Sequence, residues 1–184
     1  MKIIAFAGSP SSKSINKKLA TYATTLFGSN DVEILDINDY EMPLYTIDRE
    51  AAIGQHELAQ AFLEKIASAN VLVVSLAENN GNYSAAFKNL FDWCSRIRKD
   101  VFQEKPTLLM ATSPGARGGK GVLAIASENL PRYGMVVSQT FSLPSFNDNF
   151  DSGRNAISNQ PLDAELREKV RNMETSVMEN GAAQ

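Results

Sequence analysis

The sequence has little that could crosslink it or coordinate a metal: one cysteine and one histidine among 184 residues. A single cysteine excludes an intramolecular disulfide, and one Cys with one His cannot form a four-ligand Cys/His zinc site. No apolar run approaches the roughly 18 residues of a membrane span. The apolar stretch at residues 3–7 is also shorter than the roughly 7–15 residues of a signal peptide. We therefore expect a cytoplasmic protein without a membrane segment.

The charge is not one-sided either. Eighteen Lys and Arg residues face 21 Asp and Glu residues, which gives a net charge of -3. Nucleic-acid-binding proteins usually carry a basic excess, so we expect no nucleic-acid partner. The length fits one domain that can bury a core of its own. We expect a single domain over residues 1–184, with residues 179–184 as a disordered tail.

Short apolar runs alternate with longer amphipathic stretches along the chain. The runs are of strand length and rich in aliphatic residues, and they lie at 3–7, 32–36, 71–76, 107–112 and 135–141. The stretches between them space their apolar residues for one face of a helix, at 14–27, 53–68, 84–99, 119–130 and 163–178. Strand–helix alternation of this kind predicts an α/β fold, a parallel sheet of five strands with helices on both faces. Residues 143–160 are typical of a loop, either a lid or an irregular connection.

Ligands of open α/β sheets bind at the carboxyl ends of the strands, near the point where the strand order reverses. The first, third and fourth predicted strands each end in an unusual segment. In the strand order 2-1-3-4-5 these three ends are neighbours. We therefore expect the three segments to form one site.

The segment after the first strand, residues 8–16, is rich in serine and leads into a helix. Hydroxyl and backbone N–H groups at a helix N-terminus favour a phosphate. The alternative is an ordinary serine-rich helix cap. The segment matches neither the Walker pattern nor G-x-G-x-x-G.

The other two segments are polar or rich in glycine. Residues 77–84 offer Glu78, Asn79, Asn80 and Gly81, which could bind a planar polar ring or could form a solvated Asn-Gly turn. Residues 112–121 contain four glycines, which suggests close approach of a ligand to the backbone. Residues 119–124 fit G-x-G-x-x-A but follow the fourth strand without the expected acidic partner, so we do not interpret them as a dinucleotide fingerprint.

Together these segments resemble a known family. The matching residues are Gly8-Ser9-x-x-x-x-Ser14-x-Asn16, Glu78-x-Asn80-Gly81, Lys88-Asn89-x-x-Asp92-Trp93 and Ser113-Pro114-Gly115-x-x-Gly118-Gly119. They resemble the NADPH-dependent FMN reductase family, which includes quinone, azo-dye and chromate reductases. The resemblance covers about residues 2 to 140.

The resemblance implies a flavodoxin-like three-layer sandwich that binds FMN. It implies that Ser9, Ser11, Ser14, Ile15 and Asn16 surround the phosphate, that Glu78, Asn79, Asn80 and Gly81 line the isoalloxazine ring, and that Ser113, Gly115 and Gly118 lie along its other edge. It further implies NADPH or NADH as electron donor, a small-molecule acceptor such as a quinone or azo compound or free flavin, and a homodimer or homotetramer with the flavin near a subunit boundary. Asp92 and Trp93 are interpreted as packing or subunit contacts, with the Trp93 indole available to a partner.

The chain departs from the family pattern at several positions. The family often has Arg where this chain has Ser11, and Lys13 is a candidate to supply that charge. It often has Pro and Tyr where this chain has Ala77 and Asn79, and Pro where it has Ser84.

Two other functions stay open at this point: a flavodoxin-like FMN electron carrier without NAD(P)H activity, and a binding module that has lost its cofactor. Of the remaining reactive residues, we interpret Cys94 as a core residue and Arg117 as a surface residue, with attraction of NADPH phosphates as the alternative for Arg117. A hydrolase triad built on His56 is disfavoured, because there is one histidine and no G-x-S-x-G.

Overall fold

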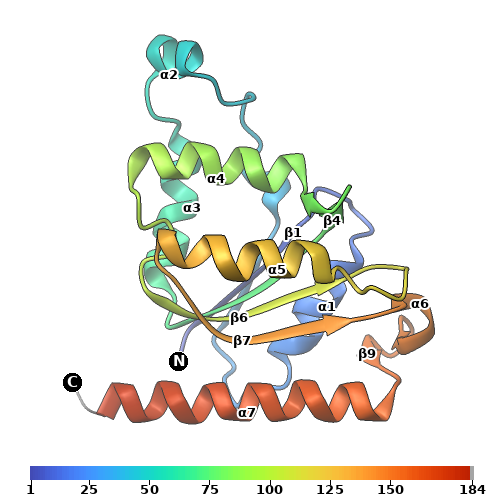
Figure 1. Cartoon of the computed structure of the whole chain (residues 1–184). Coiled ribbons are helices and arrows are strands. Elements are labelled where there is room, and N and C mark those ends of the chain that lie inside the picture. The colour runs from blue at the N-terminus through green and yellow to red at the C-terminus, as the bar shows by residue number, and fades with distance from the viewer. Residues whose placement is uncertain (183–184) are drawn as a thin grey trace.

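A five-stranded parallel sheet forms the centre of the protein in the computed structural model, which describes residues 1–182 (Figure 1). The strands are β1 (Ile3–Gly8), β2 (Val32–Leu35), β3 (Val71–Leu76), β6 (Lys105–Thr112) and β7 (Met135–Leu143). Their order is β2-β1-β3-β6-β7, and all neighbouring pairs are parallel. The predicted order 2-1-3-4-5 is therefore confirmed.

Helices cover both faces of the sheet, so the fold has three layers. On one face lie α1 (Ile15–Thr24) and α7 (Gln160–Ala182), and on the other lie α3 (Glu57–Ser68), α4 (Ala85–Ile97) and α5 (Lys120–Asn129). In β1, Ile3 and Ala5 pack toward α1 and α7, whereas Ile4 and Phe6 pack toward α3 and α4. A strand buried on both faces needs apolar residues at successive positions, which explains the uninterrupted apolar run.

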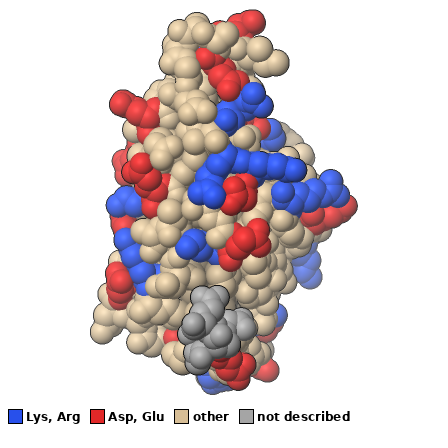
Figure 2. Space-filling model, turned by 90° about the vertical axis from the view of Figure 1, so that its left-hand side faces the viewer, with Lys and Arg blue, Asp and Glu red and all other residues tan. Residues whose placement is uncertain are grey.

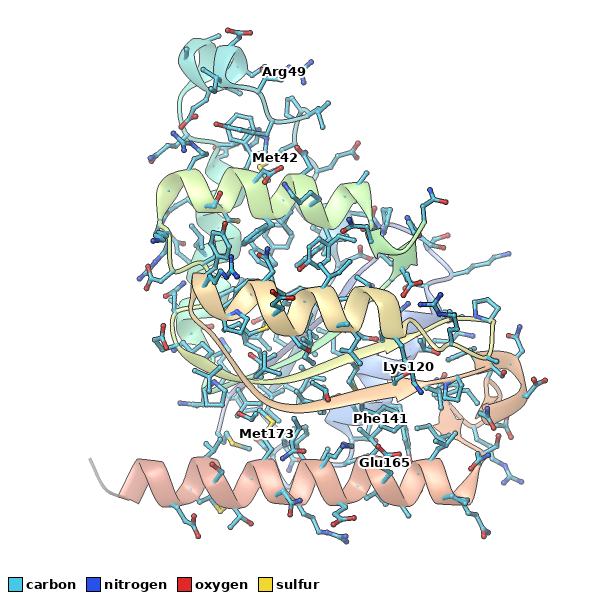
Figure 3. All side chains as sticks on the ribbon, viewed as in Figure 1. Met42, Arg49, Lys120, Phe141, Glu165 and Met173 are labelled. Carbon is cyan, nitrogen blue, oxygen red and sulfur yellow. The ribbon has the colours of Figure 1, made fainter. Side chains whose placement is uncertain are left out.

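Several short elements were not predicted. They are η1 (Ile37–Tyr40), α2 (Ile47–Ile53), the hairpin β4 (Glu78–Asn79) with β5 (Asn82–Tyr83), η2 (Leu130–Tyr133), α6 (Phe146–Asn149), and the pair β8 (Phe150–Asp151) and β9 (Ala156–Ile157). Helix α2 projects from the body as an arm above α4, with Met42 at its base and Arg49 on the helix (Figures 1 and 3).

The single helix predicted over 53–68 is wrong at its start. Ile53 ends α2, and Gly54 terminates that helix with a φ of +74°. Helix α3 begins only at Glu57, because the Nδ1 atom of His56 accepts a hydrogen bond from the Leu58 N–H at 3.2 Å and caps the helix. The histidine considered for a triad is therefore an N-cap.

The segment 143–160 is ordered rather than loop-like. It contains α6 and the β8–β9 pair, and it buries Phe146, Phe150 and Ile157 in the core beside α1 and α7. Phe141 of β7 and Met173 of α7 belong to the same cluster and lie between these two elements (Figure 3). These buried side chains make the segment an irregular connection, not a lid.

Helix α7 extends to Ala182, past Glu179, where we expected disorder to begin; Ala183 and Gln184 lie outside the described residues. Within the described chain, α7 and the other helices are all too short or too polar to span a bilayer. Figure 2 views the end of the molecule where the strands begin, opposite the three strand-end segments, and there basic and acidic side chains are interspersed.

Candidate functional site

The loop between β1 and α1 is folded by its own serines. The hydroxyl oxygens of Ser9 and Ser11 accept hydrogen bonds from the N–H groups of Ser11 and Lys13, at 3.3 and 3.2 Å. Ser14 is the N-cap of α1, and its Oγ accepts the Lys17 N–H at 3.1 Å. The helix-cap alternative is thus correct for Ser14, but it leaves the loop's remaining donors to be explained.

Several backbone donors at or just before the start of α1 are without a partner in the described part of the protein. Within residues 1–182, the N–H groups of Ser12, Ile15 and Asn16 make no hydrogen bond to the protein. They lie at a helix N-terminus, where the partial positive charge favours an anion. The serine hydroxyls keep their own protons as further donors, so the loop has the donor set that a phosphate group requires.

The three lysines near this loop differ in whether their ammonium groups bond to other side chains. Lys17 Nζ lies 2.6 Å from Asp36 Oδ2, and this hydrogen bond holds the pKa of Asp36 below its usual range. Lys18 Nζ donates to Ser152 Oγ at 3.1 Å. Lys13 is exposed within the loop itself, so it is the lysine best placed to add positive charge there.

Asn16 occupies a different position from the one expected of a phosphate ligand. Its side chain is buried, with 3% exposed, and its Oδ1 accepts hydrogen bonds from Ser75 Oγ at 2.7 Å and from the Thr112 N–H at 3.0 Å. Its Nδ2 donates to the Thr112 carbonyl at 3.1 Å. The side chain therefore connects α1 to the ends of β3 and β6. Only the backbone N–H of Asn16 remains available as a donor to a phosphate. Sequence reasoning missed Ser75 and Thr112, which lack any local motif.

The segment after β3 is a tight hairpin. Asn80 and Gly81 have φ values of 51° and 76°, as a type I′ turn requires at its two central residues. The turn interpretation is correct, and the hairpin also presents the exposed residues Asn79, Asn80 and Gly81 at the carboxyl end of the sheet. Ser84 follows it and caps α4 by accepting the Phe87 N–H, while its hydroxyl donates to the Gly8 carbonyl at 2.9 Å. A proline could not make these bonds.

Glu78 points from this hairpin to the N-terminus of α5. Its Oε2 accepts the Val122 N–H at 2.8 Å. A Cβ atom on Gly121 would lie 2.7 Å from the same oxygen. The glycine therefore makes room for a carboxylate of the protein itself, and not for a ligand.

Two other glycines of the 112–121 segment are also explained by packing. A Cβ on Gly118 would lie 2.6 Å from Ser142 Oγ, and one on Gly119 would lie 2.8 Å from Ala111 Cβ. Gly118 is buried against the end of β7, and its position along the ring edge stays a prediction.

Residues 114–117 of this segment are exposed to solvent. Gly115 is exposed, and the N–H groups of Ser145 and Phe146 hold the loop by donating to the carbonyls of Gly115 and Ser113 at 3.0 Å each. Arg117 is exposed on this loop. Lys120 begins α5 at the same end of the molecule (Figure 3).

A hollow of about 310 Å³ adjoins the serine loop on the side of β2. Pro10 forms one wall, and the other walls come from η1, the chain entering the arm, and the first turns of α4, including Ala85 and Asn89. Asn89 holds the arm through its Oδ1, which accepts the Tyr45 N–H at 2.8 Å. Its volume lies at the lower end of the range of ligand pockets, about 300–1,000 Å³.

The Trp93 side chain is buried within the chain and is not available for contact with another subunit. Its side chain is 0% exposed, its Nε1 donates to the Pro43 carbonyl at 2.8 Å, and its ring packs edge-on against Tyr45. The subunit-contact interpretation is wrong because the chain entering the arm folds over the indole, and the packing interpretation holds. Cys94 is buried beside it, and burial raises the pKa of this thiol to about 12, as expected for a core residue.

The parallel sheet with polar loops at the ends of β1, β3 and β6 defines a flavodoxin-like protein with a serine-rich loop at the strand-order switch point. Comparison with known proteins narrows this class. Residues 1–148 match the NADPH-dependent FMN reductase family, and the chain belongs to that family. FMN is therefore its cofactor and NAD(P)H its electron donor, and the protein is an oxidoreductase.

Individual relatives agree with this assignment. The chain is 34% identical over 132 residues to a 2-hydroxy-1,4-benzoquinone reductase from Burkholderia sp, an alignment that covers 71% of this chain and 68% of that protein. It is 30% identical to an NAD(P)H-dependent FMN reductase from Pseudomonas aeruginosa, over 64% of this chain and 63% of that one. Among solved structures, the FerB flavoenzyme NAD(P)H:(acceptor) oxidoreductase from Paracoccus denitrificans superposes with a TM-score of 0.71 at 22% identity, covering 95% of this chain and 98% of that one.

Proposed function

We propose that this protein transfers electrons from NAD(P)H through FMN to a small quinone-like or azo acceptor, or to free flavin. The family match carries this proposal, because residues 1–148 include all three strand-end segments. The relatives named above act on a hydroxybenzoquinone and on FMN. Because this reaction consumes NAD(P)H, we place it in the cytoplasm.

The serine loop fits the phosphate of FMN. The hydroxyls of Ser9, Ser11 and Ser14 and the N–H groups of Ile15 and Asn16 would hold it, with Lys13 adding charge. When bound, FMN supplies the ring through which electrons pass from NAD(P)H to the acceptor. The protein's own task is to bind, orient and tune that ring.

The hairpin and the 113–118 segment would lie on either side of the ring. The exposed amides of Asn79 and Asn80 and the backbone of Gly81, Ser113 and Gly115 offer both donors and acceptors to its polar edges. Asn79 is a small polar residue where the family often has a tyrosine, which leaves space above the hairpin for an acceptor.

An absorption spectrum combined with a turnover assay tests the proposal. Protein reconstituted with FMN should show flavin bands, should release FMN on heating, and should oxidise NADPH rapidly when benzoquinone is added. Failure to bind FMN at micromolar concentration would refute the proposal. Binding without NADPH oxidation would instead favour a flavodoxin-like electron carrier.

We also propose that the protein assembles as a homodimer or homotetramer through the arm. Leu44, Ile47 and Ile53 are 67%, 75% and 54% exposed, and α2 buries none of its residues. A seven-residue helix is marginal without tertiary contacts, so a partner surface would account for it. Light scattering should show an oligomer that Ile47→Asp dissociates, whereas the matched control Met178→Asp, at an exposed position on α7, should leave it intact. A monomeric wild-type protein would contradict this.

A further inference from the structure

Helix α5 starts without a side-chain cap of its own. Its N-cap is Gly119, and no cap hydrogen bond comes from that residue. The Glu78 carboxylate takes this role from a distant segment, accepting the N–H of Val122 in the first turn. A negative charge at this end of a helix is stabilised by the helix dipole.

This contact joins the two segments that are proposed to flank the FMN ring. Glu78 is the first residue of the β4–β5 hairpin, and α5 directly follows the 113–119 segment. Gly121 is part of the arrangement, since a methyl group there would overlap the carboxylate oxygen at 2.7 Å. The acidic residue and the glycine thus act as one unit, although 43 positions separate them in the sequence.

We propose that Glu78 is a positioning residue that fixes the hairpin against α5 and makes the electrostatic environment beside the flavin ring less positive. This rests on the proposed function, because it assumes that FMN lies between the two segments. A fixed negative charge near the ring disfavours the gain of electrons, so Glu78 should lower the reduction potential of the bound flavin. It would also cancel the positive end of α5, which would otherwise attract an anion.

The contact itself is tested in the apoprotein with a double-mutant cycle. Alone, Gly121→Ala should lower the urea midpoint, because its methyl group displaces the carboxylate. In a Glu78→Ala background the same change should raise the midpoint, because alanine favours a helix more than glycine does. Loss of downfield shift and of exchange protection at the Val122 amide in Glu78→Ala would support the contact. Additive effects of the two changes would overturn it.

The electrostatic effect is tested in the FMN-loaded protein with Glu78→Gln. The amide oxygen can still accept the Val122 N–H, so the hairpin stays in place while the charge is lost. We expect reduced FMN to bind about tenfold tighter relative to oxidised FMN, which raises the midpoint potential by about 30 mV for two electrons. The matched control is Glu128→Gln, which removes an exposed charge from the far end of the same helix.

The outcomes separate this inference from the proposed function. If wild-type protein binds FMN but Glu78→Gln and Glu128→Gln have the same potential as wild type, the tuning role of Glu78 is refuted and the function stands. If wild-type protein fails to bind FMN, the function is refuted together with the tuning role. In that case the double-mutant cycle in the apoprotein still tests whether Glu78 contacts the N-terminus of α5.

Discussion

Replacing Asn16 by alanine should destabilise the protein strongly, even in the absence of any cofactor. The Asn16 side chain makes three buried hydrogen bonds, one with Ser75 and two with the backbone of Thr112. Ser75 and Thr112 are themselves almost fully buried. Alanine would leave a hydroxyl, an N–H and a carbonyl without their partner at the junction of α1, β3 and β6.

The magnitude follows from the cost of unsatisfied buried groups. Each costs about 1–3 kcal/mol, and water entering the space left by the amide would relieve part of the total. We expect a loss of about 3–5 kcal/mol, a large share of the 5–15 kcal/mol that stabilises a typical domain. With a urea m-value of about 2 kcal/mol/M, the midpoint should fall by about 1.5 M or more.

Urea unfolding of the apoprotein, followed by circular dichroism, measures this loss. The matched control is Asn172→Ala, which removes the same side chain from an exposed position on α7 and should change the midpoint little. A loss below about 1 kcal/mol for Asn16→Ala, combined with much weaker FMN binding, would refute the reasoning, since it would make the side chain a phosphate ligand.

The Asn16→Asp variant adds a pH test. Its carboxylate would face the Thr112 carbonyl, whereas the protonated acid could donate to that oxygen as the amide does. Burial and this contact should raise the folded-state pKa above the unfolded value of about 3.9. The variant should therefore be closest to wild type below about pH 4 and should lose stability relative to wild type as the pH rises through the folded-state pKa toward 8. A deficit that does not depend on pH would contradict this.

Ser14→Asp should keep α1 capped, because aspartate is also a good N-cap, but it should weaken FMN binding more than tenfold by repelling the phosphate, as measured by flavin fluorescence. Gly118→Ala should cost about 2 kcal/mol through its φ of +58° and its contacts, which lowers the Tm by about 4–8 °C in calorimetry; an unchanged Tm would show that the loop can move aside. Trp93→Phe removes the hydrogen bond to the Pro43 carbonyl and should cost about 1–2 kcal/mol in urea unfolding without changing the mass in light scattering, whereas dissociation would restore the subunit-contact interpretation. Because burial raises the pKa of Cys94 to about 12, the thiol should resist Ellman's reagent at pH 8 until urea unfolds the protein; fast labelling of folded protein would contradict its burial.

The sequence by itself determined the strands and the layers, because burial on both faces imposes continuous apolar runs such as 71–76 and because amphipathic helices keep a fixed spacing. The strand order, which makes the three strand-end segments neighbours, followed from the flavodoxin-like fold that the family resemblance implies. The turn at Asn80 and Gly81 could also be predicted from the sequence, because a turn that needs a positive φ at two successive residues favours Asn followed by Gly. The arm helix α2 could not be predicted. None of its residues is buried, so burial imposes no helical spacing of apolar residues on its sequence.

Only the tertiary structure decided what individual residues of the site do. Asn16 lies in the segment that the sequence predicts to bind phosphate. Its side chain instead forms hydrogen bonds with Ser75 and Thr112, which are 59 and 96 residues away. Gly121 belongs to a glycine-rich segment typical of ligand contact, but its space is filled by Glu78, 43 positions earlier. A pattern of residue types states which donors, acceptors and small residues are available. Which of them bond to each other, and which remain to face a ligand, depends on contacts between segments that the fold alone brings together.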